Sequence, residues 1–137
     1  MKSFLRYAWA SPNTLLGLLL VVLAFLSRGR VRLVDGVLET AGGIPAFFLR
    51  WMPIGSDGAA AMTLGHVVVG RDEARLRVTR AHERVHVAQY ERWGPFFLPA
   101  YGLSSLACLC TGKEAYRDNR FEREAYASDE ARRKRMM

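Results

Sequence analysis

The chain has 137 residues, of which 50% are apolar, and a formal net charge of +7. This length suffices for one hydrophobic core but not for two domains of ordinary size, and the apolar share is normal for a soluble domain. The positive charge favours lipid headgroups or nucleic acid as partners, but the sequence has no zinc-finger spacing, ribonucleoprotein signature or basic region with heptads, so we expect no nucleic-acid partner.

The first element is an uncharged, apolar segment over residues 7–26, with basic residues on both sides. Its length of about 20 residues is close to the minimum for crossing a bilayer, although Pro12 and Asn13 interrupt it. No small-x-small cleavage site follows it, which argues against a removed signal peptide. A buried core helix is the other alternative. We expect residues 1–28 to form a retained membrane anchor that either spans the bilayer or is half-embedded in it.

Two β elements and one apolar segment follow. Residues 29–43 contain "VRLV" and "VLET" on either side of Asp35-Gly36, which favours a β-hairpin with a type I′ turn. Residues 44–55, "IPAFFLRWMPIG", are typical of a segment at a membrane interface or of a loop packed on a core. The β-branched stretch "MTLGHVVVG", residues 62–70, predicts a strand.

Helical patterns dominate the second half of the chain. Residues 72–93 have helical spacing of apolar residues and contain no Gly or Pro; Asp72 is placed to cap the start and Gly94 to end it. The next apolar run, residues 94–110, is short and is interrupted by two prolines and a glycine. We expect a last helix to begin near Asn119 and to continue into the basic tail.

Two histidines, His82 and His86, lie four residues apart in "HERVH". One helical turn places both imidazoles on the same face, where they can bind a single ion. Glu83 completes an H-E-x-x-H pattern, in which a carboxylate serves as general base toward a metal-bound water. Two exposed helical histidines without a metal are the simpler alternative.

A catalytic zinc ion also needs a third protein ligand and one position for water. His66 is one candidate, although a half-buried sheet residue explains it as well. Glu122 and Glu124, in "FEREAY", lie on different faces of the expected last helix, so both cannot point at one ion. Glu122 can alternatively form a capping box with Asn119.

The pairing of "HERVH" with the downstream "FEREAY" resembles the gluzincin metallopeptidases, in particular their membrane-bound HtpX-like and CaaX-protease-like branches. In those branches the third zinc ligand is the first Glu of a helical E-x-x-A-D pattern. The resemblance therefore implies that Glu122 is the third ligand, with Ala125 at the Ala position. It covers mainly residues 62–126. The run HERVHV-x-QYERWGP also resembles small bacterial membrane proteins.

This sequence departs from the family pattern at two positions. Tyr126 stands where the family has Asp, so we expect Asp129 or Asn119 to orient a ligand in its place. Arg84 stands between the two histidines, where the family has uncharged residues.

The resemblance implies an α+β fold: a small zincin-like domain over residues 29–137 with a short β-sheet, an HExxH helix and a C-terminal ligand helix, preceded by the hydrophobic N-terminal helix.

The resemblance also implies a membrane-associated metallopeptidase in which His82, His86 and Glu122 bind Zn2+, and Glu83 activates a zinc-bound water that hydrolyses peptide bonds. Its partners would be membrane lipid and a peptide or protein substrate, at the bacterial inner membrane. The basic tail favours a catalytic face in the cytoplasm. The alternative is a non-catalytic zinc-binding or membrane-surface scaffold protein of the same fold. The candidates for stabilising the oxyanion are Tyr90, Tyr101, Tyr116 and Tyr126.

The two motifs also constrain the membrane topology. If residues 94–110 crossed the bilayer, His82 and Glu122 would lie on opposite sides of a hydrocarbon core about 30 Å thick. Ligand bonds of about 2 Å cannot bridge that distance. We therefore expect residues 94–110 to form a non-spanning hairpin or a buried helix.

Overall fold

The computed structural model describes residues 2–54 and 57–137. They form α1 (Lys2–Leu26), β1 (Arg30–Val34), β2 (Val37–Ala41), α2 (Gly43–Arg50), β3 (Ala61–Leu64), β4 (Val67–Gly70), α3 (Glu73–Trp93), a 3-10 turn η1 (Gly94–Phe96), α4 (Phe97–Cys110) and α5 (Arg120–Met136). The strands make one sheet of order β1-β2-β4-β3, in which β2 and β4 are parallel and the other two pairs antiparallel. This confirms an α+β fold that begins with an apolar helix.

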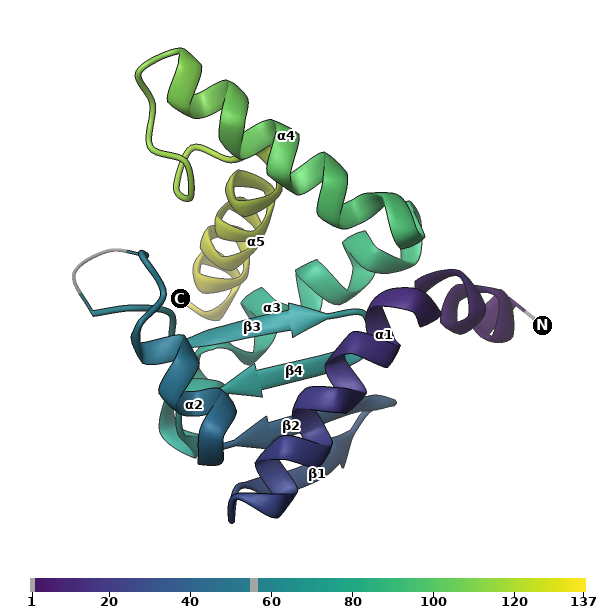
Figure 1. The fold of residues 1–137 in the computed structure, drawn as a ribbon. Helices are drawn as coiled ribbons and strands as arrows, with labels where there is room; N and C mark the ends of the chain where they lie inside the picture. Colours follow the sequence, from purple (N-terminus) through teal and green to yellow (C-terminus); the bar gives the residue numbers. More distant parts are fainter. Residues whose placement is uncertain (1, 55–56) are drawn as a thin grey trace.

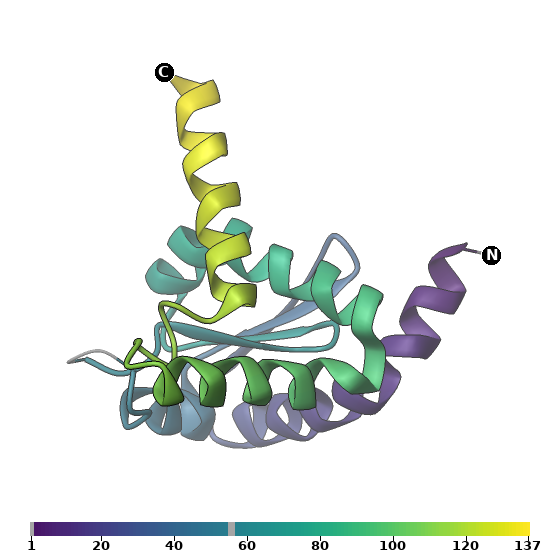
Figure 2. The same ribbon diagram turned by 90° about the horizontal axis from the view of Figure 1, so that it is seen from above.

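The sheet lies between helices (Figures 1 and 2). α1 and α2 cover one face, and α3 covers the other. Val67 and Val69 of β4 pack with Leu49 of α2, whereas Val68 packs with Val87 of α3. Because both faces of β4 are buried, its sequence is a continuous run of valines and not an alternating one.

The two tight turns of the sheet differ in how well the sequence predicts them. Asp35 and Gly36 have φ values of 49° and 79°, which confirms a hairpin with left-handed turn residues. We expected residues 62–70 to form one strand, but they belong to the hairpin β3–β4. It turns at Gly65, whose φ is 60° and where a Cβ atom would lie 2.2 Å from Oγ1 of Thr14 on α1. The turn thus depends on a contact with a helix about 50 residues earlier.

α3 and α5 begin close to where the sequence predicts, whereas residues 97–110 form the largely exposed helix α4 and not the expected hairpin or buried helix. The Asp72 carboxylate accepts from the backbone N–H of Arg75 at 2.8 Å and caps α3, and Gly94 follows its last residue. Asn119 caps α5 through the N–H of Phe121 at 3.0 Å. Residues 44–50 belong to helix α2 and not to a loop. That residues 44–55 lie at a membrane interface stays a prediction, and residue 55 lies outside the described residues.

α1 packs along the sheet through small residues. Ala10, Gly17 and Ala24 are buried, and the buried amide of Asn13 donates to the carbonyl of Gly94 at 2.9 Å. The opposite side of α1 exposes large apolar side chains. Two helical stretches, Lys2–Leu26 and Glu73–Cys110, are long and apolar enough to cross a membrane. The second contains both α3 and α4, which are separated by the turn at Gly94.

Candidate metal centre

Two elements far apart in sequence bring His82, His86 and Glu122 together. The histidines lie one turn apart on α3, and Glu122 lies in the first turn of α5, which packs across α3. Oε2 of Glu122 is 3.1 Å from Nε2 of His82 and 3.3 Å from Nε2 of His86. All three side chains are buried, and one donor atom from each lies within 4.8 Å of the others. The cluster could hold a metal ion.

The donor set fits a divalent ion such as zinc. Two imidazole nitrogens and one carboxylate oxygen are common zinc ligands, and bonds of about 2.0–2.1 Å in a tetrahedral site place neighbouring donors about 3.3 Å apart. The distances from Glu122 agree with this value. They also suit charge-assisted hydrogen bonds between imidazolium and carboxylate groups. The geometry therefore defines a ligand set and leaves the identity of the ion open.

Each of the three side chains is held by a further hydrogen bond at its other polar atom. These contacts are His82 Nδ1 with Asp129 Oδ2 at 2.8 Å, His86 Nδ1 with Gln89 Oε1 at 2.9 Å, and the hydroxyl of Tyr101 donating to Glu122 Oε1 at 2.7 Å. Such partners orient ligands and set the tautomer of each histidine.

The proton positions follow from these partners. The amide nitrogen of Gln89 donates to the carbonyl of Phe121 at 3.1 Å, so its oxygen is the acceptor that faces His86. Nδ1 of His86 therefore carries a proton. The Asp129 carboxylate accepts from Nδ1 of His82 in the same way. Both Nε2 atoms, which face Glu122, are then the nitrogens available to a metal ion.

Asp129 and Asn119, the two expected substitutes for the missing family Asp, have different roles in the structure. Asp129 lies near His82, one turn beyond Tyr126, whose ring centroid is 4.7 Å from that of His82. Asn119 caps α5 and donates to the carbonyl of Tyr101 at 3.0 Å. No capping box forms, because the backbone N–H of Asn119 donates to the carbonyl of Tyr116 and the Glu122 carboxylate points into the cluster.

Glu83 is buried beside the cluster, with 5% of its surface exposed. Its Oε2 accepts from the hydroxyl of Thr63 on β3 at 2.7 Å. Burial raises the pKa of Glu83 above the ordinary value, although the nearby histidines oppose this shift. A carboxylate with a raised pKa, fixed next to a candidate metal site, suits a general base near neutral pH.

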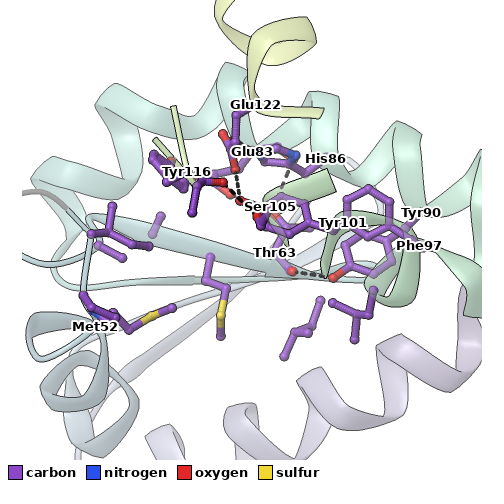
Figure 3. Close-up of a pocket in the computed structure, with 18 residues that line it drawn as sticks. Met52, Thr63, Glu83, His86, Tyr90, Phe97, Tyr101, Ser105, Tyr116 and Glu122 are labelled. Carbon is purple, nitrogen blue, oxygen red and sulfur yellow. Dashed lines mark hydrogen bonds and ion pairs between the residues drawn. The ribbon is translucent and has the colours of Figure 1, made fainter. Parts of the chain in front are cut away.

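A cavity of about 300 Å³ adjoins these groups (Figure 3). Glu83, His86 and Glu122 lie on one wall. The rest is mostly apolar and comes from β3, from α4 and from the segment after α2, including Met52, Met62, Leu64, Phe97 and Leu98. An apolar cavity with a few convergent polar groups is the usual form of a ligand site.

The ionisation of the cluster reflects its close pairing. Burial disfavours the charged forms of His82 and Glu122, but their mutual hydrogen bond and their other partners outweigh it. The pKa of His82 rises to about 9 and that of Glu122 falls to about 2. The pKa of His86 is also raised by Glu122, against the effect of burial. Without a metal, the cluster is therefore a network of imidazolium and carboxylate groups.

The other candidate ligands lie away from the cluster. His66 is in the β3–β4 turn, where its Nε2 bonds to Glu91 at 2.9 Å and its ring stacks on Tyr7. Glu124 lies at the surface, 3.4 Å from Arg92. Among the tyrosines, Tyr90, Tyr101 and Tyr116 line the cavity, and Tyr126 packs on His82.

Arg84, the charged residue between the two histidines, points toward the sheet. Its guanidinium donates to the carbonyl of Val34 at 3.0 Å and to the buried carboxylate of Glu39 at 2.8 Å. Arg80 binds the same carboxylate. Arg84, which departs from the gluzincin pattern that the sequence resembles, therefore serves a buried ion-pair network on β2 and does not enter the cluster of His82, His86 and Glu122.

Two residues that orient the cluster, Thr63 and Gln89, were not identified from the sequence, and Tyr101 was a candidate for stabilising the oxyanion but instead donates to Glu122. Gln89 carried a detectable signal, because it lies three residues after His86 and so on the same helix face. Thr63 and Tyr101 come from β3 and α4, and no spacing in the sequence connects them to α3.

Compared with protein-family models, with curated proteins and with solved structures, the chain finds no match. Its function is therefore inferred from the chemistry of the cluster and of the cavity beside it.

Proposed function

We propose that the chain is a zinc-dependent metallopeptidase that works at a membrane. His82, His86 and Glu122 hold the ion, and Glu83 is the general base. The observation that supports this most strongly is the convergence of the three ligands beside a separate, buried carboxylate that opens onto a cavity. The gluzincin assignment and a zincin-like fold are part of the same proposal.

Each residue has a distinct role in this mechanism. When bound, zinc supplies Lewis acidity, which makes water a nucleophile at neutral pH and polarises a carbonyl group. Glu83 takes the proton of the attacking water and passes it to the leaving amine, while Thr63 holds the Glu83 carboxylate in place. Tyr101 already donates to Glu122, so we assign Tyr116, on the cavity wall, to donate a hydrogen bond to the substrate carbonyl oxygen.

The position of β3 supports a peptide as substrate. β3 is the last strand of the sheet order, and residues 61–64 line the cavity. An extended peptide can add to such an edge through main-chain hydrogen bonds, with its side chains entering the cavity. We place the protein at the bacterial inner membrane with the cluster on the cytoplasmic side, because its basic C-terminal tail suits the anionic cytoplasmic leaflet.

The experiment compares three variants of the full chain for zinc content and peptide hydrolysis. Glu83→Gln should retain one zinc per chain and lose at least about 100-fold in hydrolysis, because it keeps the ligands and removes the base. Glu122→Gln should lose both zinc and hydrolysis. Glu124→Gln, a matched change on the exposed side of α5, should lose neither. Full hydrolysis by Glu83→Gln, or a wild-type chain that binds no zinc, would contradict the proposal.

A second candidate is a non-catalytic scaffold protein of the same fold. The observation that favours it is that the polar atoms of the cluster already have protein partners, so the site is stable without an ion. Zinc binding that depends on Glu122, together with no hydrolysis of any peptide or membrane protein offered, would identify this candidate.

A further inference from the structure

The outer sides of α1, α2 and α4 expose many large apolar side chains. One example from each helix is Leu19 at 68%, Phe48 at 60% and Leu106 at 56%. The set comprises Leu15, Leu16, Leu19, Val22, Phe25, Leu26, Ile44, Phe47, Phe48, Trp51, Leu98, Leu103, Leu106 and Leu109. Soluble monomers rarely expose apolar groups in such density, so this surface is expected to contact an apolar partner.

The three helices lie along one side of the molecule (Figure 2). α1 and α2 cover the outer face of the sheet and α4 continues beside them, whereas α3 lies on the other side of the sheet and α5 projects away. We call the exposed side of α1, α2 and α4 the apolar face. It is built from three helices separated in sequence, so it is a property of the folded chain.

The packing of α1 determines how this face can meet a bilayer. Gly17 lies so close to β4 that a Cβ atom there would be 2.6 Å from the Cβ of Val67, and Asn13 bonds to Gly94. α1 therefore lies against the sheet and α3, with only its outer side free for lipid. A helix that crossed the bilayer alone would have to give up these contacts.

Charge distinguishes a lipid bilayer from a second copy of the chain as the partner. Residues 7–27, 43–49 and 94–112 contain no charged residue. Exposed basic residues follow all three helices or end them: Arg28, Arg50 and Lys113. Within residues 2–54 and 57–137 none of the three has a carboxylate partner. We call Arg28, Arg50 and Lys113 the basic rim of the apolar face. A second copy of the chain would bring like charges to this rim, whereas anionic headgroups would neutralise them.

We infer that α1, α2 and α4 lie together in the plane of a bilayer, with the apolar face in the acyl region of one leaflet and the basic rim among anionic headgroups. No segment crosses the membrane. Amphipathic helices bound in this way enter to about 5–10 Å. The inference rests on the proposed membrane association but not on the metal. It places the cavity, whose walls include α4 and the segment after α2, at the lipid surface.

Binding to vesicles of phosphatidylglycerol and phosphatidylcholine tests the surface. Phe48→Glu and Leu106→Glu should each lower the partition coefficient roughly 10-fold, because each loses the burial of one large apolar side chain. Val78→Glu is the matched control: Val78 is 81% exposed, but on α3. Arg50→Gln should weaken binding to anionic vesicles and leave binding to pure phosphatidylcholine unchanged.

Three results would contradict the inference that the apolar face binds a lipid bilayer. One is no vesicle binding by the wild-type chain. Another is an equal loss in Val78→Glu. The third is a wild-type dimer that Phe48→Glu dissociates without any change in lipid binding. Circular dichroism of each variant shows whether it is folded, and the wild-type comparison between anionic and neutral vesicles requires no variant at all.

A labelling experiment separates in-plane insertion from a membrane span. In a Cys108→Ser, Cys110→Ser background, Lys2→Cys and Arg133→Cys each add one cysteine, near opposite ends of the chain. A membrane-impermeant maleimide is added to right-side-out and to inside-out vesicles. Both cysteines should be labelled in the same vesicle preparation, because both lie on the same side of the membrane. Reaction in opposite orientations would show that α1 crosses the bilayer, and would overturn the in-plane inference while membrane association stands.

Discussion

Asp129 shows how a single side chain can complete the site from outside the expected motif. It lies one turn beyond Tyr126, the position at which the family has its Asp, and accepts from Nδ1 of His82 at 2.8 Å. Asp129→Ala should weaken zinc affinity about 10–100-fold, because His82 then loses the partner that orients its ring and raises its basicity. Competition with a chromophoric chelator measures this. Glu130→Gln, an exposed neighbour paired with Lys134, is the control and should bind zinc like the wild type.

At the level of residues, helix spacing predicts the histidine pair and the motif resemblance predicts Glu122, but the orienting roles of Thr63 and Tyr101 were not predicted. The spacing of His82 and His86 follows from helix geometry alone, and the choice of Glu122 over Glu124 agrees with the structure, since only Glu122 lies at the cluster. Thr63 and Tyr101 reach the site through the sheet order and the path of α4. These depend on tertiary packing, which leaves no local spacing to detect.

At the level of elements, helix ends were predictable because their signals are local. Asp72 and Asn119 cap α3 and α5 with their own side chains. The β3–β4 hairpin was missed because Gly65 lies within the mostly β-branched and apolar stretch of residues 62–69, and its turn packs against Thr14 of α1. Whether residues 1–28 form a separate anchor remains a prediction, although α1 contacts α2, α3 and β4.

The contact between α1 and the sheet can be tested with two Gly→Ala substitutions in helices. Gly17→Ala should destabilise the chain by about 1–3 kcal/mol, because the added Cβ would lie 2.6 Å from Val67. Gly102→Ala in α4 should be neutral or should stabilise by up to about 1 kcal/mol, because a Cβ there has no neighbour within 4 Å and Ala favours the helix. Denaturant unfolding monitored by circular dichroism gives both values. Equal effects would show that α1 does not pack as described.

For the whole molecule, the cluster links stability to pH because it joins α5 to α3. Glu122 has a folded pKa of about 2, below its ordinary 4.5, so its contribution is present above pH 4.5 and is lost as the pH falls toward 2. His82 has a folded pKa of about 9, above its ordinary 6.5, so its contribution is present below pH 6.5 and is lost as the pH rises through 9. The metal-free chain is therefore most stable between about pH 4.5 and pH 6.5, where both contributions are fully present.

Zinc should reverse the alkaline part of this profile. Zinc binds the neutral imidazole, so binding must displace the protons on His82 and His86, and affinity rises with pH until His82 has titrated near 9. Thermal unfolding of the metal-free chain should show a Tm that falls from pH 6.5 to 9, while the increase in Tm caused by excess zinc grows over the same range. In Glu122→Gln both trends should be reduced, because one carboxylate that raises the pKa values of both histidines is gone, while Asp129 and Glu83 still raise that of His82. A metal-free Tm that is constant from pH 6.5 to 9 would mean that His82 does not carry the proton that its hydrogen bonds imply.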